Sequence, residues 1–338
     1  MVLENRDIDY SIVICTYNPD ERLLQRCLRA VAQLNRHNIS TEVLLVDNNS
    51  TVPVASLPFV QAHLRQIPGM RLLHAPEQGL KYARIAGIEA AAGRHIVFFD
   101  DDNEPDSDYL QGLQQLHTLY PNVGAWGPGH VWVEFIDGIA ADIERYARVA
   151  FQERHEGETA YARLPGWQPC YPFGTGLCIH TLLLKAYVAG IREGQLTLPG
   201  RKGRLLSSGD DTQMVLLCIS KGYAAGIAPL LKIKHMIPGK RCSYQYLHRL
   251  AYGTGVCYDT CLLQVFPEHR QQLEQRLLPA AKFSRQALKQ FLRSRWRASF
   301  FKTAALINYI SVHAGVYMAL DKPLPEPVNK ILKYLKVT

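Results

Sequence analysis

Three adjacent carboxylates, Asp100–Asp102, stand directly after the apolar run His95–Phe99. Carboxylates this close repel one another unless a cation is bound, and hard oxygen ligands suit Mg²⁺ or Mn²⁺. A solvated acidic turn is the alternative interpretation. We favour a metal site, because two more polar clusters, Thr16-Tyr17-Asn18 and Asp47-Asn48-Asn49, also follow apolar runs.

The segments around these clusters alternate between strand and helix patterns. Short β-branched apolar runs predict strands, and apolar residues three and four positions apart predict helices. The predicted strands are Ser11–Thr16, Glu42–Val46, Arg71–Leu73 and His95–Phe99, and the predicted helices are Asp20–Leu34, Gly79–Ala92 and one from Pro105 to about Tyr120. This alternation predicts an α/β fold with a mostly parallel, Rossmann-like sheet flanked by helices. Such sheets bind ligands at the carboxyl ends of their strands, where the three polar clusters would meet.

The rest of the chain is irregular at first and then mainly helical. Val123–Val133 is strand-like, Gly138–Gly166 is interpreted as helical and then irregular, and a helix is predicted over Thr212–Lys221. From Ser243 onward the pattern is mainly helical. We therefore expect a catalytic domain over residues 1–240 and a helical, basic C-terminal region over residues 241–338.

The net charge of +8 is concentrated near the C-terminus. Residues 270–338 contain 13 Lys and Arg against 3 Asp and Glu, a net charge of +10, which leaves −2 for residues 1–269. A basic tail favours an anionic lipid surface as partner, with nucleic acid less favoured and a solvated helix face as the alternative. Thr303–Leu320 is too short and too polar for a membrane span, so we interpret it as a core or interfacial helix.

Eight cysteines are scattered without a CxxC pair, and the N-terminal segment lacks the basic and apolar parts of a secretory leader. These features predict reduced thiols and a cytoplasmic protein, with peripheral association at the cytosolic face of the membrane. Neither GxxxxGK[ST] nor GxGxxG occurs in the sequence, which excludes the two commonest phosphate-binding loops.

Six segments carry a resemblance in their order and spacing. They are SIVICTYN at 11–18, LLVDNNS at 44–50, GLKYARIAGIEAAAGRHIVFFDDDN at 79–103, FGTGLCIH at 173–180, SSGDDTQM at 207–214 and KIKHMIPGKRCSYQYLHRLAYGTG at 232–255. Together they resemble family 2 glycosyltransferases with the GT-A fold, of the bacterial polysaccharide-biosynthesis type. Those enzymes carry a TYN strand end, a VDDGS-like turn, a DXD motif and a GEDxEL motif. The resemblance covers about residues 10–255.

The resemblance implies a donor site at the first strand ends. Thr16, Tyr17 and Asp47 would hold the nucleoside of a nucleotide-sugar donor, with Asn18 beside them. The nucleoside is usually uridine-like in this family, so a UDP-sugar is the favoured donor. Arg84 would lie near the diphosphate.

The resemblance also assigns the aspartate triplet to the DXD motif. Asp100 and Asp102 would be its outer residues, with Asp102 the most direct ligand of Mn²⁺ or Mg²⁺. Asp101 would join the donor-binding set and could replace Asp100 in the register. His235 would complete the metal or diphosphate site, and a structural histidine at a strand end is the alternative.

The segment at 207–214 would supply the general base. Asp211 matches the aspartate of the family's ED motif, and Asp210 stands where glutamate is usual, so the register could slip by one residue. Both aspartates also precede a predicted helix, which offers a capping role as the alternative.

These expectations describe a metal-dependent, inverting glycosyltransferase. Asp211 would accept a proton from an acceptor hydroxyl, and the cation would neutralise the leaving nucleoside diphosphate. The acceptor would be a saccharide or a lipid-linked precursor in polysaccharide biosynthesis. A nucleotidyltransferase and a non-catalytic scaffold that binds membrane or RNA through its tail stay open as alternatives.

Overall fold

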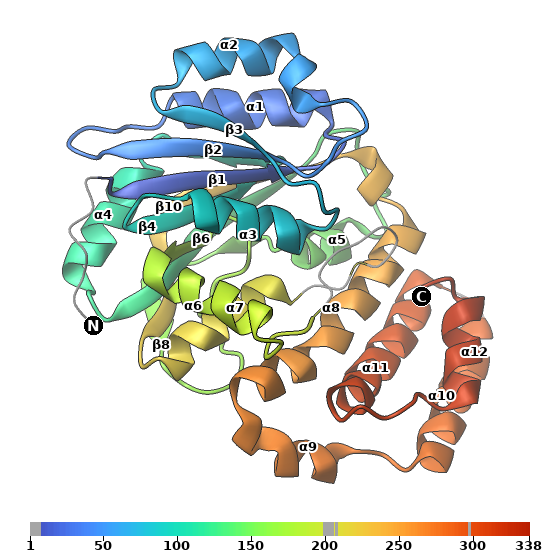
Figure 1. Cartoon of the computed structure of the whole chain (residues 1–338). Coiled ribbons are helices and arrows are strands. Elements are labelled where there is room, and N and C mark those ends of the chain that lie inside the picture. Colours follow the sequence, from blue (N-terminus) through green and yellow to red (C-terminus); the bar gives the residue numbers. More distant parts are fainter. Residues whose placement is uncertain (1–7, 199–205, 207–208, 297–298) are drawn as a thin grey trace.

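The structure is a computed structural model, and it describes residues 8–198, 206, 209–296 and 299–338. Figure 1 shows helices on both faces of a twisted sheet, with the C-terminal helices gathered beside it. The α/β class predicted from the alternating pattern is confirmed.

The strands form one sheet. They are β1 (Tyr10–Thr16), β2 (Thr41–Asp47), β3 (Met70–His74), β4 (His95–Asp100), β5 (Asn103–Pro105), β6 (Val123–Phe135), β7 (Arg154–His155), β8 (Ala160–Ala162), β9 (Cys178–His180) and β10 (Ala224–Ile237). The order is β3-β2-β1-β4-β9-β6-β10-β5, with β7 paired to β6 and β8 paired to β10. The long strands pair in parallel, β3-β2-β1-β4 and β6-β10. The short strands β5, β7, β8 and β9 pair antiparallel.

Alternate residues of β1 face two different layers. Ile12 and Ile14 share a buried core with α1 (Glu21–Ala32), α2 (Pro58–Gln66) and α4 (Tyr109–Leu119). Val13 and Cys15 share another with α3 (Leu80–Ala90), α6 (Thr181–Arg192) and α7 (Asp210–Ser220). Gly87 lets α3 approach the sheet closely, because a Cβ there would lie 2.5 Å from Val13 Cγ1. The helices α2 and α6 were not predicted from the sequence.

The helix predicted to start at Pro105 begins later, at Tyr109. Asn103–Pro105 instead forms the edge strand β5, which pairs with Ile233–His235 of β10. Proline is tolerated at a strand edge, where its missing N–H breaks no ladder bond. Farther along, Gly138–Gly166 contains α5 (Glu144–Ala150), as predicted, together with the unpredicted strands β7 and β8.

The C-terminal helices continue the core of the sheet layer. They are α8 (Tyr244–Val265), α9 (Arg270–Arg276), α10 (Ala280–Arg295), α11 (Phe300–Ala319) and α12 (Glu326–Tyr334), and short 3₁₀ turns occur at Val54–Ser56, Gly239–Arg241 and Pro267–His269. Ile307 and Ile310 of α11 lie in the same buried cluster as Val13, so Thr303–Leu320 belongs to a core helix. Among the described residues, no helix combines the length and apolarity that a membrane crossing needs. The division at residue 240 stays a prediction, and the buried core runs across it.

Candidate active site

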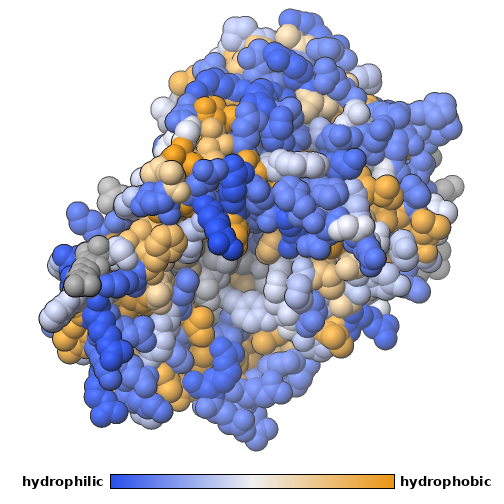
Figure 2. Space-filling model, turned by 180° about the vertical axis from the view of Figure 1, so that it is seen from behind, coloured by the Kyte–Doolittle hydropathy of each residue, from blue (hydrophilic) through white to orange (hydrophobic). Residues whose placement is uncertain are grey.

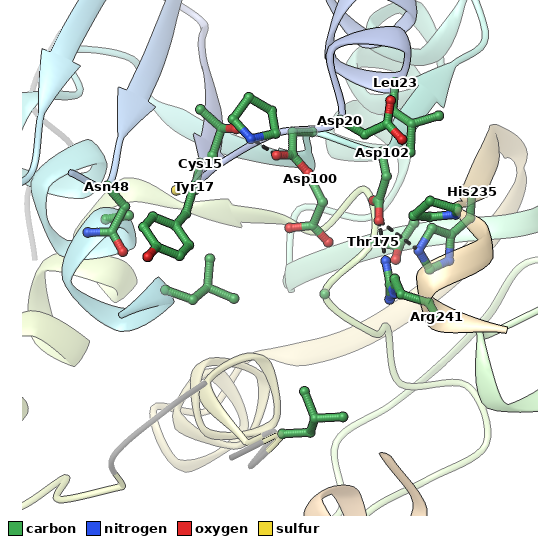
Figure 3. A pocket seen from close by; sticks show the side chains of 18 of the residues that line it. Cys15, Tyr17, Asp20, Leu23, Asn48, Asp100, Asp102, Thr175, His235 and Arg241 are labelled. Atoms are coloured by element: carbon green, nitrogen blue, oxygen red, sulfur yellow. Dashed lines mark hydrogen bonds and ion pairs between the residues drawn. The ribbon is translucent and has the colours of Figure 1, made fainter. Parts of the chain in front are cut away.

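A cavity of about 570 Å³ lies at the carboxyl ends of β1 and β4. Figure 3 shows side chains from both strands and from the segment after β10 facing this space. The sequence-predicted site residues that line it are Thr16, Tyr17, Asn18, Arg84, Asp100, Asp101, Asp102, Asp210, Asp211 and His235. The predicted meeting of polar strand ends therefore occurs, and segments as far apart in the sequence as Thr16 and His235 line the same cavity.

Asp101 faces the end of β1. Its Oδ2 accepts a hydrogen bond of 2.6 Å from Thr16 Oγ1. Burial, with the charge of Asp102 beside it, raises the pKa of Asp101 to about 7. This carboxyl thus links the two central strands at the cavity rim.

Asp102 has partners on both of its carboxylate oxygens. Its Oδ2 forms an ion pair with Arg241 and lies 3.6 Å from His235 Nε2, and its Oδ1 accepts from Asn103 Nδ2 at 3.0 Å. Burial raises the pKa of Asp102, but His235 and Arg241 outweigh burial and hold that pKa below its usual range. Asp102 is therefore a buried carboxylate that stays charged.

His235 presents one ring nitrogen to Asp102. Its Nδ1 lies 2.9 Å from the carbonyl oxygen of Phe151, and a carbonyl only accepts, so Nδ1 donates. Nε2 is left facing the carboxylate. A backbone carbonyl that fixes the tautomer in this way is the usual support of a metal-binding histidine.

Asp102 and His235 fit a divalent cation that is bound together with a phosphorylated ligand. Mg²⁺ and similar cations often take only one or two protein ligands and complete their shell with substrate phosphates. Within the described residues, no group of three His, Cys, Asp or Glu side chains could hold a metal ion. The role of Asp100 as a further ligand stays a prediction.

Arg241, which was not predicted from the sequence, supplies the positive charge beside Asp102 and His235. Its guanidinium lies over the rings of Phe151 and Tyr246, at 5.1 and 5.7 Å from their centroids. Burial lowers the pKa of Arg241, but Tyr246 and Asp102 more than compensate, so the group is charged. The signal was present, since Arg241 stands in the segment at 232–255 that carries part of the family resemblance.

A second charge cluster surrounds Arg84, which projects from α3. Burial lowers the pKa of Arg84, and the carboxylates of Asp100, Asp210 and Asp211 raise it further than burial lowers it. One cation thus faces three carboxylates. Gly174 allows this packing, because a Cβ there would lie 3.0 Å from Asp211 Oδ2 and 3.2 Å from Arg84 Nη2.

Asp210 and Asp211 occupy the first turn of α7, where a helix favours negative charge. Asp210 is buried, at 4% exposure, whereas Asp211 is partly exposed. Asp211 Oδ1 accepts from Thr212 N at 3.0 Å. Of the two candidates for the base, Asp211 is the one that an acceptor could reach more easily.

Tyr17 and Asn18 follow β1 directly and form a ledge at the edge of the cavity. Tyr17 is 49% exposed. Its hydroxyl accepts from Gln78 Nε2 at 3.3 Å. Asn18 adopts a left-handed conformation with φ of 45°, and its Oδ1 accepts from Thr51 N at 2.8 Å. The ledge is therefore tied to the neighbouring loop while the tyrosine face stays open.

Asp47 lies outside the cavity lining, unlike the other predicted residues. Its two carboxylate oxygens accept from Ser50 N at 2.9 Å and Val54 N at 3.0 Å, so it holds its own loop. The next residue, Asn48, lines the cavity, and its Nδ2 donates to the Glu77 carbonyl at 2.6 Å. Adjacent residues at a strand end point in different directions, and the sequence predicted Asp47 in place of Asn48.

Comparison with known proteins agrees with this geometry. The model of glycosyl transferase family 2 matches residues 11–160. Glycosyltransferase AglE of Haloferax volcanii is 33% identical over 104 residues, which cover 30% of this chain and 33% of that protein. N-acetylgalactosaminyltransferase 4 of Drosophila melanogaster is 29% identical over 117 residues, which cover 33% of this chain and 18% of that protein. The matches thus span a third or less of these relatives.

Among solved structures, the mannosyltransferase PcManGT from Pyrobaculum calidifontis, in complex with GDP-Man and Mn²⁺, has a TM-score of 0.50. The match is 17% identical and covers 99% of this chain and 89% of that one, and at this identity it supports the fold alone. Residues 11–160 thus match the model of glycosyl transferase family 2, and the chain has the GT-A fold.

Proposed function

We propose that this chain transfers a sugar from a nucleoside-diphosphate donor to a hydroxyl of a saccharide or lipid-linked acceptor. One observation carries the proposal: a charge-paired corner of Asp102, His235 and Arg241 shares a cavity with the helix-terminal Asp211. The first set suits a diphosphate and its cation, and Asp211 suits a proton acceptor. PcManGT, which shares the fold, was crystallised with GDP-Man and Mn²⁺.

The nucleoside would lie on the ledge after β1. The exposed face of Tyr17 offers a stacking surface for a base, and Asn48 lies at the same edge. Asp47 would act indirectly, by fixing the loop that carries Asn48. We propose a UDP-sugar as the donor, because the family that the sequence resembles usually binds uridine nucleotides.

Asp102 and His235 would hold Mn²⁺ or Mg²⁺ at the diphosphate. The cation, when bound, would neutralise the charge that develops on the leaving diphosphate. Arg241 pairs with Asp102, and its planar fork of donors suits a phosphate oxygen equally well. The charge of Arg84 would hold the carboxylates of Asp100, Asp210 and Asp211 in place.

Asp211 would accept the proton of the acceptor hydroxyl. The acceptor oxygen would form its bond to the anomeric carbon while the bond from that carbon to the β-phosphate oxygen breaks. The nucleoside diphosphate would leave on the opposite face, so a single displacement inverts the anomeric centre. We propose that such a reaction extends a precursor in polysaccharide biosynthesis.

The test is isothermal titration of UDP into the full chain, with Mn²⁺ and then with EDTA. We expect binding that needs both Mn²⁺ and Asp102, and hence is lost in Asp102→Asn. Asp108→Asn is the matched control, because Asp108 is exposed and does not line the cavity. UDP-sugars are then screened for release of UDP.

Other outcomes would overturn parts of the proposal. Binding of GDP in place of UDP would keep the transferase and change the donor. Release of pyrophosphate from a nucleoside triphosphate would identify a nucleotidyltransferase. No metal-dependent binding of UDP, GDP, CMP or dTDP would favour the scaffold.

A further inference from the structure

Helix α10 exposes a continuous apolar ridge. Leu288, Leu292 and Trp296 follow one another at intervals of four residues, so they lie on one face of the helix and its C-terminal end. Their exposed fractions are 48%, 61% and 77%, rising toward the end of the helix. Large apolar side chains in a row on a charged protein surface usually mark a binding surface.

The opposite face of α10 is firmly packed, so the exposed ridge is a property of the fold. Phe283 and Ala287 are fully buried. The ring of Phe283 lies 5.6 Å from that of Tyr317 and 6.1 Å from that of Tyr309, both on α11. The helix is therefore held with its ridge turned outward.

A basic ridge runs beside the apolar one. Arg285, Lys289 and Arg293 are exposed and also follow at intervals of four residues. Among the described residues, none of the three has an ion-pair partner, and α10 contains neither Asp nor Glu. The neighbouring helix α12 adds exposed basic side chains, namely Lys330, Lys333 and Lys336 in and just after it.

We propose that these two ridges, Leu288-Leu292-Trp296 and Arg285-Lys289-Arg293, form a surface that docks on an anionic lipid bilayer. The negative charge of acidic lipid headgroups complements the positive charge of the basic ridge. The interfacial region of a bilayer accepts leucine and tryptophan side chains. RNA would satisfy the basic ridge alone and would leave the apolar ridge in water. In Figure 2, strongly hydrophilic and hydrophobic groups adjoin on the lower left, where the C-terminal helices lie after the half turn.

The proposed contact with lipid depends on the proposed function only in its purpose. It would bring a lipid-linked acceptor within reach of the cavity. Binding to vesicles needs neither a donor nor a metal. The titration of UDP, repeated on the same preparations, therefore separates failure of the lipid proposal from failure of the transferase.

The experiment is flotation of the full chain with vesicles of phosphatidylcholine, alone or mixed with phosphatidylglycerol. We expect binding to the mixed vesicles only, weakened by added salt. Replacing the basic ridge, in Arg285→Gln/Lys289→Gln/Arg293→Gln, should weaken binding on the order of 100-fold, since each basic side chain contributes severalfold near an anionic surface. Replacing the apolar ridge, in Leu288→Gln/Leu292→Gln/Trp296→Gln, should abolish the binding that persists at high salt.

Two matched controls have the same size of change on other exposed positions. They are Arg65→Gln/Lys185→Gln/Lys221→Gln for charge and Leu119→Gln/Val149→Gln/Leu164→Gln for apolar surface. Both should float like the unchanged chain. Equal losses of vesicle binding in the controls and the ridge variants would overturn the proposal. So would a dimer in sedimentation that dissociates in the apolar-ridge variant. Binding of RNA without binding of vesicles would overturn it as well.

Discussion

Largely buried titratable side chains lie near both ends of β4, but they are uncharged at its start and charged just past its end. At the start of β4, the ring of His95 stacks on His117 at 3.9 Å, and His180 meets it edge-on at 5.0 Å. Burial, reinforced by the neighbouring histidines, lowers the pKa of His95 and lowers that of His117 to about 4. Just past the other end of β4, Asp102 is also buried. It stays charged, because Arg241 and His235 face it.

The comparison separates two effects of burial. A buried group without an opposite charge loses its own charge, whereas a buried group with a close partner keeps it. The carboxyl end of β4 therefore presents charged groups to the cavity, whereas the histidines at its start are packed without a charge of their own.

The largest effect is expected at Asp211, the proposed proton acceptor. Asp211→Asn keeps the size of the side chain and removes its basicity, so kcat should fall about 10²- to 10⁴-fold while UDP affinity changes little. Release of UDP from a UDP-sugar and titration of UDP measure the two quantities. Asp210→Asn is the matched variant, and a larger loss of kcat in Asp210→Asn would assign the base to Asp210.

The charged corner can be broken from its cationic side. Arg241→Met removes the partner of Asp102 and leaves a carboxylate that a free cation can neutralise. We expect Mn²⁺ to bind roughly tenfold more tightly without nucleotide, and UDP to bind roughly tenfold more weakly with Mn²⁺ present. The electron paramagnetic resonance signal of free Mn²⁺ reports the first change without any turnover.

Lys240→Met is the control for this variant, because Lys240 also lines the cavity and neighbours Arg241. It should leave Mn²⁺ affinity near that of the unchanged chain. An unaltered Mn²⁺ affinity in Arg241→Met would mean that the ion pair does not compete with the cation.

A subtler change concerns the packing around Asp211. In Gly174→Ala the new methyl group would lie 3.0 Å from Asp211 Oδ2 and 3.2 Å from Arg84 Nη2. Both side chains must shift by a few tenths of an ångström, so we expect a severalfold, at most about tenfold, fall in kcat. The melting temperature of Gly174→Ala should change little. The control is Gly138→Ala, where an added Cβ would meet no atom within 4 Å, although the φ of 79° strains the backbone of any residue but glycine. A loss of kcat in the control alone would contradict the packing argument.

The smallest effect is expected at the neutral end of β4. The pKa of His117 is lower in the folded chain than in the unfolded one, so its stabilising effect is complete above about pH 6.5. As the pH falls toward 4, the unfolded chain binds a proton that the folded chain does not, and the free energy of unfolding decreases. In His117→Phe, the decrease between pH 7 and pH 5 should be smaller by about 1 kcal/mol, since the ring is partly reached by solvent.

Urea unfolding at the two pH values measures this difference. His117→Phe also loses the hydrogen bond between Tyr10 and His117, at 2.9 Å, so it should be less stable at both pH values. The exposed His37, replaced by Phe, is the control for the change of residue type. An acid dependence that is the same in both variants would refute the assignment to the cluster.

Much of the parallel half of the fold could be predicted from sequence, because its signals are local. The apolar run before Asp100–Asp102 and the stripe of Leu24, Cys27 and Leu28 each fix one element without reference to the rest of the chain. The polar residues that line the cavity directly after β1 and β4 could be predicted for the same reason. The family resemblance added Asp211 and His235.

The parts that could not be predicted depend on distant pairing. Arg241 gains its role from Asp102, which precedes it by 139 residues. The choice between Asp47 and Asn48 depends on side-chain direction at a strand end, which residue type does not specify. The strand β9 is only three residues long and lies antiparallel between β4 and β6, so it has no period to read.

The position of β10 has a consequence for the way the chain is made. This strand lies between β6 and β5, although it is the last to be synthesised. A nascent chain that ends after α7 already contains Asp102 and Asp211 but still has a 13-residue strand, β6, with one edge open to other chains. We therefore expect that residues 224–241, on leaving the ribosome, cover the open edge of β6 and bring His235 and Arg241 to the cavity in the same step.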